Sequence, residues 1–130
     1  MAGKIIADTI ETGAGADIPT SYVVNGSAKA WIDIPSGQAS INASFNVSSL
    51  DDDGVGDGGV NFTSSMTSSL YAWTSGTDDN NRTTNMLTAD ITRGTKSSSS
   101  YDFNSVEINA TVNRTDSDFD NFHIIMGDLA

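Results

Sequence analysis

Residues that could carry acid–base or nucleophilic chemistry are few in this sequence. His123 is the only histidine, and it lies between Phe122 and Ile124 in an apolar segment, which is more typical of an exposed or core-edge position than of a general base. The chain has no cysteine and no Gly-X-Ser-X-Gly motif. Glu11 and Glu107 are a conceivable glycosidase pair, but Glu11 precedes the predicted domain and Glu107 falls on the polar face of a predicted strand. We therefore expect no catalytic residues and no enzymatic activity.

The run Asp51–Gly59 has the acidic, glycine-rich composition of a calcium-binding loop. Its spacing does not fit the EF-hand, because a loop phased on Asp51 and Asp53 would end at Val60, where a bidentate glutamate is required. Aspartates in tight turns also hydrogen-bond their own backbone, and this interpretation is favoured. We expect no bound metal and no cofactor.

The charge of the chain excludes one class of partner. Seventeen acidic residues against six Lys and Arg give a formal net charge of -11, which repels phosphate backbones and anionic lipid headgroups. No apolar run approaches the length of a membrane span, and the N-terminal residues do not follow the pattern of a signal peptide. We expect neither nucleic acid nor membrane as a partner.

Alternating apolar and polar residues predict an all-β protein. The clearest hairpin covers Ser44–Thr63, with Asp51–Gly59 as its turn, and the clearest alternation places Val106, Ile108, Ala110 and Val112 on one face of a strand. Short strands at spacings near ten residues are typical of a β-sandwich, of jelly-roll-like form. The predicted strands are Tyr22–Val24, Ala28–Ile34, Ile41–Leu50, Gly59–Thr63, Leu70–Thr74, Met86–Thr92, Ser105–Arg114 and Phe122–Met126.

Turn residues predict how these strands connect. Asn25-Gly26 is the strongest two-residue hairpin signal and predicts that Tyr22–Val24 pairs with Ala28–Ile34. Further turn clusters are expected at Asp78–Arg82, Thr95–Ser100 and Thr115–Asp118, and the low-complexity run Ser97–Ser100 is expected to be a mobile loop tip.

The N-terminal residues differ in pattern from the rest of the chain. Residues 1–18 are expected to form a short extended arm, and residues 19–130 the β-sandwich domain. Small residues at Gly13–Ala16 separate the arm from the domain. Lys4, Ile5, Ile6 and Ile10 are the arm residues available to a partner.

Four aromatic residues are candidates for an interface, although packing in the core is the favoured interpretation for them: Trp31, Tyr71, Trp73 and Tyr101. A small all-β chain without disulfides gains stability when neighbouring copies bury shared apolar surface. An oligomer is therefore expected.

Three segments resemble one known family. VVNGSAKAW at Val23–Trp31, FNVSSLDDDGVGDGGVNFT at Phe45–Thr63 and YAW at Tyr71–Trp73 together look like a domain found at the C-terminal tips of phage tail fibres and tailspikes. The chain is also similar to β-sandwich cement, or decoration, proteins of cyanophage capsids. The segment Asp33–Ala43 departs from the tail-fibre pattern, so no surface is carried over from it.

The resemblance implies a role in the virion. It suggests a homotrimer on the outer capsid surface that fastens neighbouring subunits of the major capsid protein, with Lys4, Ile5, Ile6 and Ile10 as the anchor. The alternative is a receptor-binding tip of a tail fibre or tailspike that recognises host surface glycan through Tyr71, Trp73 or Tyr101. The second interpretation differs in partner but not in fold.

Overall fold

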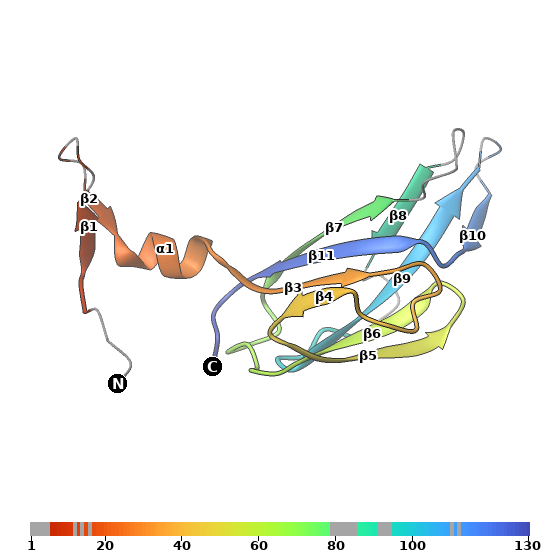
Figure 1. Cartoon of the computed structure of the whole chain (residues 1–130), viewed down its shortest axis with the longest axis horizontal. Coiled ribbons are helices and arrows are strands. Elements are labelled where there is room, and N and C mark those ends of the chain that lie inside the picture. The colour runs from red at the N-terminus through yellow and green to blue at the C-terminus, as the bar shows by residue number, and fades with distance from the viewer. Residues whose placement is uncertain are drawn as a thin grey trace.

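Two antiparallel sheets face each other and enclose the core (Figure 1). The computed structural model describes residues 6–11, 13, 15, 17–78, 86–90, 95–109, 111 and 113–130. The described chain is mostly β with one short helix, which confirms the prediction of an all-β, sandwich-like fold.

The first sheet is organised around β9. Its four-strand path runs β10 (Arg114–Asp116), β9 (Ser100–Ile108), β6 (Asp57–Phe62) and β5 (Val47–Gly54), and β8 (Met86–Asp90) also pairs with β9. Asn104 is opposite Asp57 of β6 and also opposite Asp90 of β8, so these two strands lie on opposite edges of β9. The strand β9 therefore has neighbours along both edges.

The second sheet has four strands, in the order β4 (Ala43–Phe45), β3 (Ala28–Ile34), β11 (Asp120–Met126) and β7 (Ala72–Asp78). The central pair, β3 and β11, is in register from Asn121 opposite Ile34 to Ile125 opposite Ala30, with an irregularity before Met126. Every pairing in this sheet is antiparallel.

The core is built from side chains of both sheets. Phe62 packs edge-on against Tyr71 at 5.7 Å between ring centroids and lies 5.8 Å from Tyr101. The buried apolar cluster consists of Ala30, Ile32, Ile34, Val60, Phe62, Met66, Tyr71, Tyr101, Phe103 and Ile125.

The predicted hairpin is present, but its turn is tighter than expected. The aspartates from Asp51 to Asp53 belong to β5, and only Val55 and Gly56 connect β5 to β6. Gly58, expected in the turn, is instead a packing position in β6, because a Cβ there would lie 2.9 Å from Cζ of Phe103 on the neighbouring strand. The absence of a side chain at Gly58 therefore leaves room for the ring of Phe103.

The predicted hairpin at Asn25-Gly26 is wrong. Residues Thr20–Gly26 form a helix, α1, and neither Asn25 nor Gly26 has the positive φ that the expected turn requires. The physical reason is that β3 already has β4 on one edge and β11 on the other, which leaves little edge for a further strand.

Other strand boundaries also differ from the prediction. The strand expected over Ile41–Leu50 is divided into β4 and β5, and the one expected at Leu70–Thr74 is Ala72–Asp78. β9 begins at Ser100 instead of Ser105. It ends at Ile108, because the side chain of Asn109 accepts hydrogen bonds from the backbone N–H of Thr111 and Asn113, both at 3.0 Å, and turns the chain. Ala110 and Val112, and the turn predicted after Asp78, lie outside the described residues.

The serine run is held in place by backbone hydrogen bonds. The carbonyls of Ser98 and Ser99 accept hydrogen bonds from the N–H of Met66 and Phe62, both at 2.8 Å. Ser97 Oγ accepts hydrogen bonds from the N–H of Ser99 at 3.1 Å and of Ser100 at 2.9 Å. The run therefore joins the loop after β6 to the start of β9 and is not a free loop tip.

The N-terminal residues form structure of their own. β1 (Thr9–Glu11) pairs antiparallel with β2 (Asp17–Pro19), and α1 follows directly. Figure 1 shows this hairpin and helix extending away from the sandwich, with β3 as their only continuation into it. The strands of the two large sheets thus begin at Ala28, after α1.

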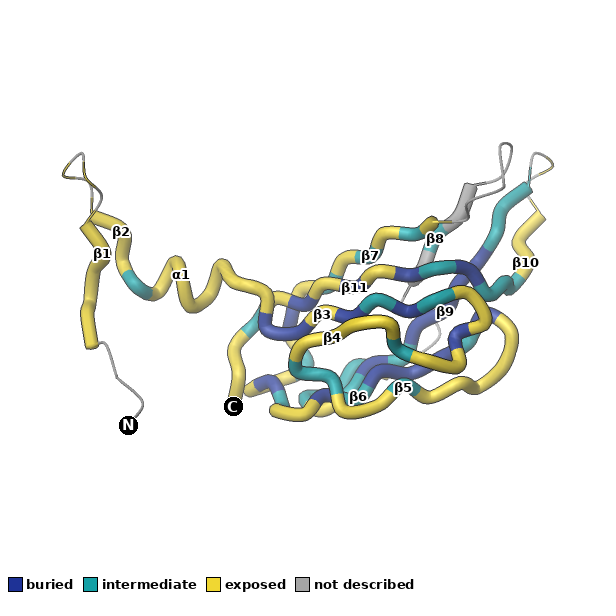
Figure 2. Tube along the Cα trace, in the orientation of Figure 1, coloured by how far each residue is buried: buried dark blue, intermediate teal, exposed yellow. Residues whose placement is uncertain are grey.

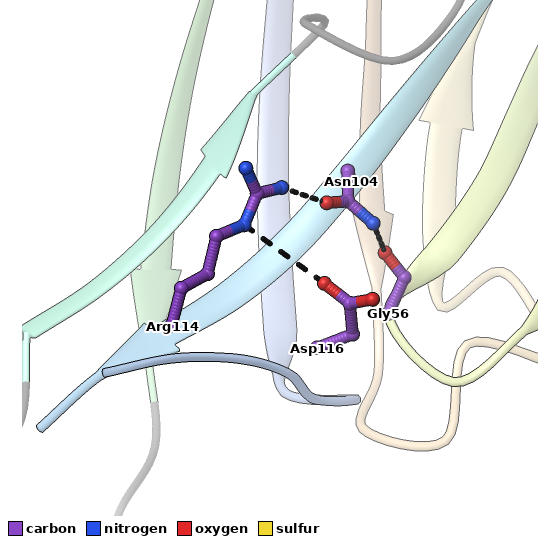
Figure 3. A network of polar contacts seen from close by, with 4 residues as sticks. All are labelled: Gly56, Asn104, Arg114 and Asp116. Carbon is purple, nitrogen blue, oxygen red and sulfur yellow. Dashed lines mark hydrogen bonds and ion pairs between the residues drawn. The ribbon is translucent and has the colours of Figure 1, made fainter.

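The turn between β5 and β6 is connected to β9 and β10 by a polar network (Figure 3). Gly56 accepts hydrogen bonds at its carbonyl from Asn104 Nδ2 at 2.6 Å and from the backbone N–H of Ser105 at 2.7 Å. Arg114 donates to the Oδ1 of Asn104 and lies 4.0 Å from a carboxylate oxygen of Asp116. Asn104 is fully buried, and its hydrogen bonds hold the turn between β5 and β6 against β9 and β10.

We predict that Gly56→Ala lowers the free energy of unfolding by about 3 kcal/mol. Gly56 has a φ of +68°, and a Cβ there would lie 2.5 Å from the carbonyl oxygen of Ser105 and 2.7 Å from the N–H nitrogen of Ser117. The matched control is Gly76→Ala, whose new methyl meets its nearest atom at 3.9 Å and should change stability by less than about 0.5 kcal/mol. Urea denaturation measures both, and equal losses would contradict this assignment.

Candidate functional site

The inner faces of β9 and β11 bring polar side chains into the core. From β9, Tyr101 and Ser105 point inward, and from β11, Asn121 and His123 do so. Tyr101 Oη and His123 Nδ1 share a hydrogen bond of 2.8 Å. This bond links one sheet to the other through the middle of the sandwich.

His123 is buried, so the expectation of an exposed or core-edge histidine is wrong. Its ring packs edge-on against Phe103 at 4.7 Å and Trp73 at 5.1 Å between centroids. Burial lowers the pKa of His123 to about 3, which keeps the ring neutral. Its Nε2 has no hydrogen-bond partner among the described residues. A neutral imidazole enclosed by aromatic rings is a structural group, since no substrate reaches it.

A second polar contact lies further along the same two strands. Ser105 Oγ accepts hydrogen bonds from Asn121 Nδ2 and Gln38 Nε2, both at 2.8 Å. The amide oxygens of Gln38 and Asn121 are buried and have no partner within the described part of the chain. Buried amides cost free energy unless they are paired, so this cluster specifies how the sheets meet instead of adding much stability.

The alternation in β11 differs from that in an ordinary sandwich strand. The polar residues Asn121 and His123 face the core together with Ile125, whereas Phe122, Ile124 and Met126 face outward. Figure 2 shows this alternation of buried and exposed positions along β11. The strand therefore presents its apolar face to the surroundings.

Neighbouring strands extend this apolar face. Phe45 of β4 is opposite Trp31 of β3, and Trp31 is opposite Ile124 of β11, so the three side chains form one row across the sheet. Phe122 occupies the next row, beside Asp33 of β3. We call Trp31, Phe45, Phe122, Ile124 and Met126 the apolar face; each of these residues is 39–53% exposed.

The outer surface of the other sheet has the opposite character. The row at the start of β9 contains Ser49, Asn61 and Ser100, and the adjacent row contains Asp51 and Asp102 on either side of Gly59. Asn61 donates to Asp51 at 2.7 Å and to Ser49 at 2.9 Å. Where the side chains are described, the outer surface of the four-stranded sheet carries an apolar patch of the kind that marks an interaction site, and that of β5, β6 and the first half of β9 is polar.

The aromatic residues proposed to contact glycan or a neighbouring chain lie inside the molecule. Tyr71 and Tyr101 belong to the core cluster, and Trp73 packs against it. Burial raises the pKa of Tyr71 to about 12 and raises that of Tyr101 as well. This corrects the expectation of a surface role for the two tyrosines, and it agrees with the favoured interpretation that they are core aromatics. Trp31 is the candidate that is exposed.

The arm residues do not join the aromatic residues in one site. Ile6 is 82% exposed and Ile10 48% exposed in the projecting hairpin. Lys4 and Ile5 lie outside the described residues. Phe45, Phe122, Ile124 and Met126 were missed as site residues, because alternation in a sequence reveals two faces of a strand without revealing which one is inside.

A shallow hollow of about 400 Å³ lies where the arm joins the sandwich. It is lined by Asn25 of α1, Leu70 and Tyr71 of the loop before β7, Met126 at the end of β11 and Asp128 after it, among others. No group of three or more histidine, cysteine or acidic side chains suitable for a metal ion occurs within the described ranges. The helix α1 has seven residues, far fewer than a membrane-spanning helix needs. Within the described part of the chain, no helix has the length and apolar character needed to span a membrane.

Comparisons with protein families, with curated proteins and with solved structures find no match to this chain.

We predict that His123 contributes to acid sensitivity. Its pKa is about 3 in the folded chain and about 6.5 when unfolded, so the unfolded chain takes up the proton first as the pH falls. Above about pH 6.5 His123 is neutral in both states and has no effect on the pH dependence of stability. As the pH falls from about 6.5 towards 3, protonation of His123 in the unfolded chain lowers the free energy of unfolding. The urea midpoint of the wild type should therefore fall more steeply across this window than that of His123→Gln. Parallel curves for the two proteins would contradict a neutral buried His123.

Proposed function

We propose that this protein is a virion structural protein that binds the outer capsid surface as a trimer and fastens neighbouring subunits of the major capsid protein. The observation that carries the proposal is the N-terminal hairpin, which extends from the sandwich with its isoleucines exposed. The resemblance to phage decoration proteins supplies the identity of the surface that it binds.

The hairpin has the features of a segment that needs a binding partner. β1 and β2 have three residues each, and all six are exposed. A two-stranded hairpin of this length is marginal in water. Ile6, Ile10 and Ile18 are all exposed on it, and each fully buried isoleucine adds on the order of 2 kcal/mol to binding.

The hairpin is nevertheless joined firmly to helix α1. Thr20 donates to the carbonyl of Asp8 from its backbone N–H at 2.9 Å and from its hydroxyl at 3.0 Å. These bonds connect the start of β1 to the start of α1. The hairpin and α1 are thus expected to bind a partner together, as one hydrogen-bonded unit.

Binding alone accounts for the mechanism. A molecule that contacts several capsid subunits adds its free energy of binding to the stability of the assembled shell. In a trimer, three arms act together, because the first attachment raises the effective concentration of the other two. The acidic outer surface of the five-stranded sheet suits a side that faces solvent.

The glycan-binding alternative loses its support in the arrangement of the aromatic residues. A sugar-binding platform requires exposed rings, and Tyr71 and Tyr101 are 4% and 0% exposed. Trp73 also packs against the core, and the exposed rings Trp31, Phe45 and Phe122 are not the residues on which this alternative rests, so we do not propose it.

We predict that deleting Ala2–Thr12 abolishes decoration of capsids that lack this protein, while the melting temperature of the sandwich changes little. Those of the deleted residues that the structure describes, residues 6–11, contribute no side chain to the core cluster. Gel densitometry or electron microscopy of the capsids measures occupancy.

Two point variants provide a matched comparison for this deletion. Ile10→Asp should reduce occupancy, whereas Val55→Asp, at an exposed apolar position in the β5–β6 turn, should not. Truncated protein that coats the capsids at wild-type occupancy would overturn the anchoring role.

A further inference from the structure

We propose that the apolar face of the four-stranded sheet is bound by helix α1 of a second copy of this chain. The contact is head to tail: each copy gives its helix to one neighbour and receives a helix from another. This inference does not rest on the capsid role.

Helix α1 lacks what it needs to be stable alone. Its sequence, TSYVVNG, contains none of the strong helix-forming residues, and its first turn has no side-chain capping hydrogen bond. Isolated helices of fewer than about 12 residues are marginal even with favourable sequences. None of its residues is buried. Its stability must come from packing against another surface.

The apolar residues of α1 are available for that packing. Tyr22, Val23 and Val24 are 49–72% exposed. The helix carries no charged residue, although the chain as a whole has a net charge of -11. Two acidic molecules repel each other least where both surfaces are uncharged, and the row Phe45, Trp31 and Ile124 is also uncharged.

Apart from Asn25, which lines the same hollow as Met126, the helix is held away from the apolar face of its own chain. Only Ser27 separates the end of α1 from the start of β3. Lys29 Nζ donates to the carbonyls of Val24 and Ser27 and so fixes the C-terminal end of the helix beside β3. Figure 1 shows that α1 then points away from the sheet. A helix covering the face therefore comes from a second copy.

The surfaces suit a contact that is weak by itself and is reinforced when a ring closes. With about 200 Å² for each fully exposed large side chain, the apolar face offers on the order of 450 Å² and the helix at most about 350 Å². One helix-on-face contact therefore buries up to about 800 Å² in total, about half of a standard interface, and in a ring each copy makes two such contacts. Head-to-tail contacts also close naturally into rings such as trimers.

Cysteine cross-linking tests this contact directly, because the chain has no native cysteine. The test chain carries Val23→Cys in the helix and Ile124→Cys in the apolar face. The matched control carries Val23→Cys and Ser49→Cys, which lies on the outer surface of the other sheet. Under oxidising conditions we expect the test chain to form disulfide-linked multimers about tenfold more efficiently than the control, because association raises the effective concentration of the paired thiols.

Three outcomes would overturn the proposal. Wild-type protein that remains a monomer by light scattering at high concentration would show that no copy supplies the helix. A link within one chain would show that the helix folds back on its own sheet. Equal multimer formation by a chain carrying Ile124→Cys alone would show that the faces meet each other instead. Purified protein suffices for all three measurements, so failure here is distinguishable from failure of capsid binding.

Discussion

Two buried polar contacts between β9 and β11 determine how the sheets of this protein stack. Tyr101 bonds to His123, and Ser105 bonds to Asn121, so the same two strands meet through hydrogen bonds at two levels of the core. A shift of β11 by one residue would place Phe122 and Ile124 inside, at the cost of leaving Tyr101 and Ser105 without these partners. The polar contacts therefore select the arrangement in which the apolar side of β11 faces outward.

This arrangement leaves the outer surfaces of the two sheets different in polarity. The five-stranded sheet ends in a polar, acidic surface, whereas the four-stranded sheet presents Trp31, Phe45 and Ile124 in a row. The N-terminal hairpin and helix are likewise exposed on all sides. Apolar surface of this extent marks a site of interaction with another surface.

The sequence was sufficient to predict the sandwich, because alternation of period two and turn residues report local geometry. It was insufficient at Asn25-Gly26, where tertiary pairing of β3 with β4 and β11 overrode a strong turn signal. It also could not predict that His123 is buried. Polar and apolar residues alternate in β11 in either orientation, and only the partners supplied by Tyr101 and Ser105, distant in sequence, distinguish the two.

Hydrogen exchange of the α1 amides at different protein concentrations tests the central claim, that the arm and the apolar face exist to be covered. If a second copy covers the helix, its amides are protected at high concentration and exchange at the rate of an unstructured peptide on dilution. The amides between β3 and β11 stay protected throughout, because the sandwich does not depend on the contact. Amides of α1 that exchange at the same rate at every concentration would contradict the account.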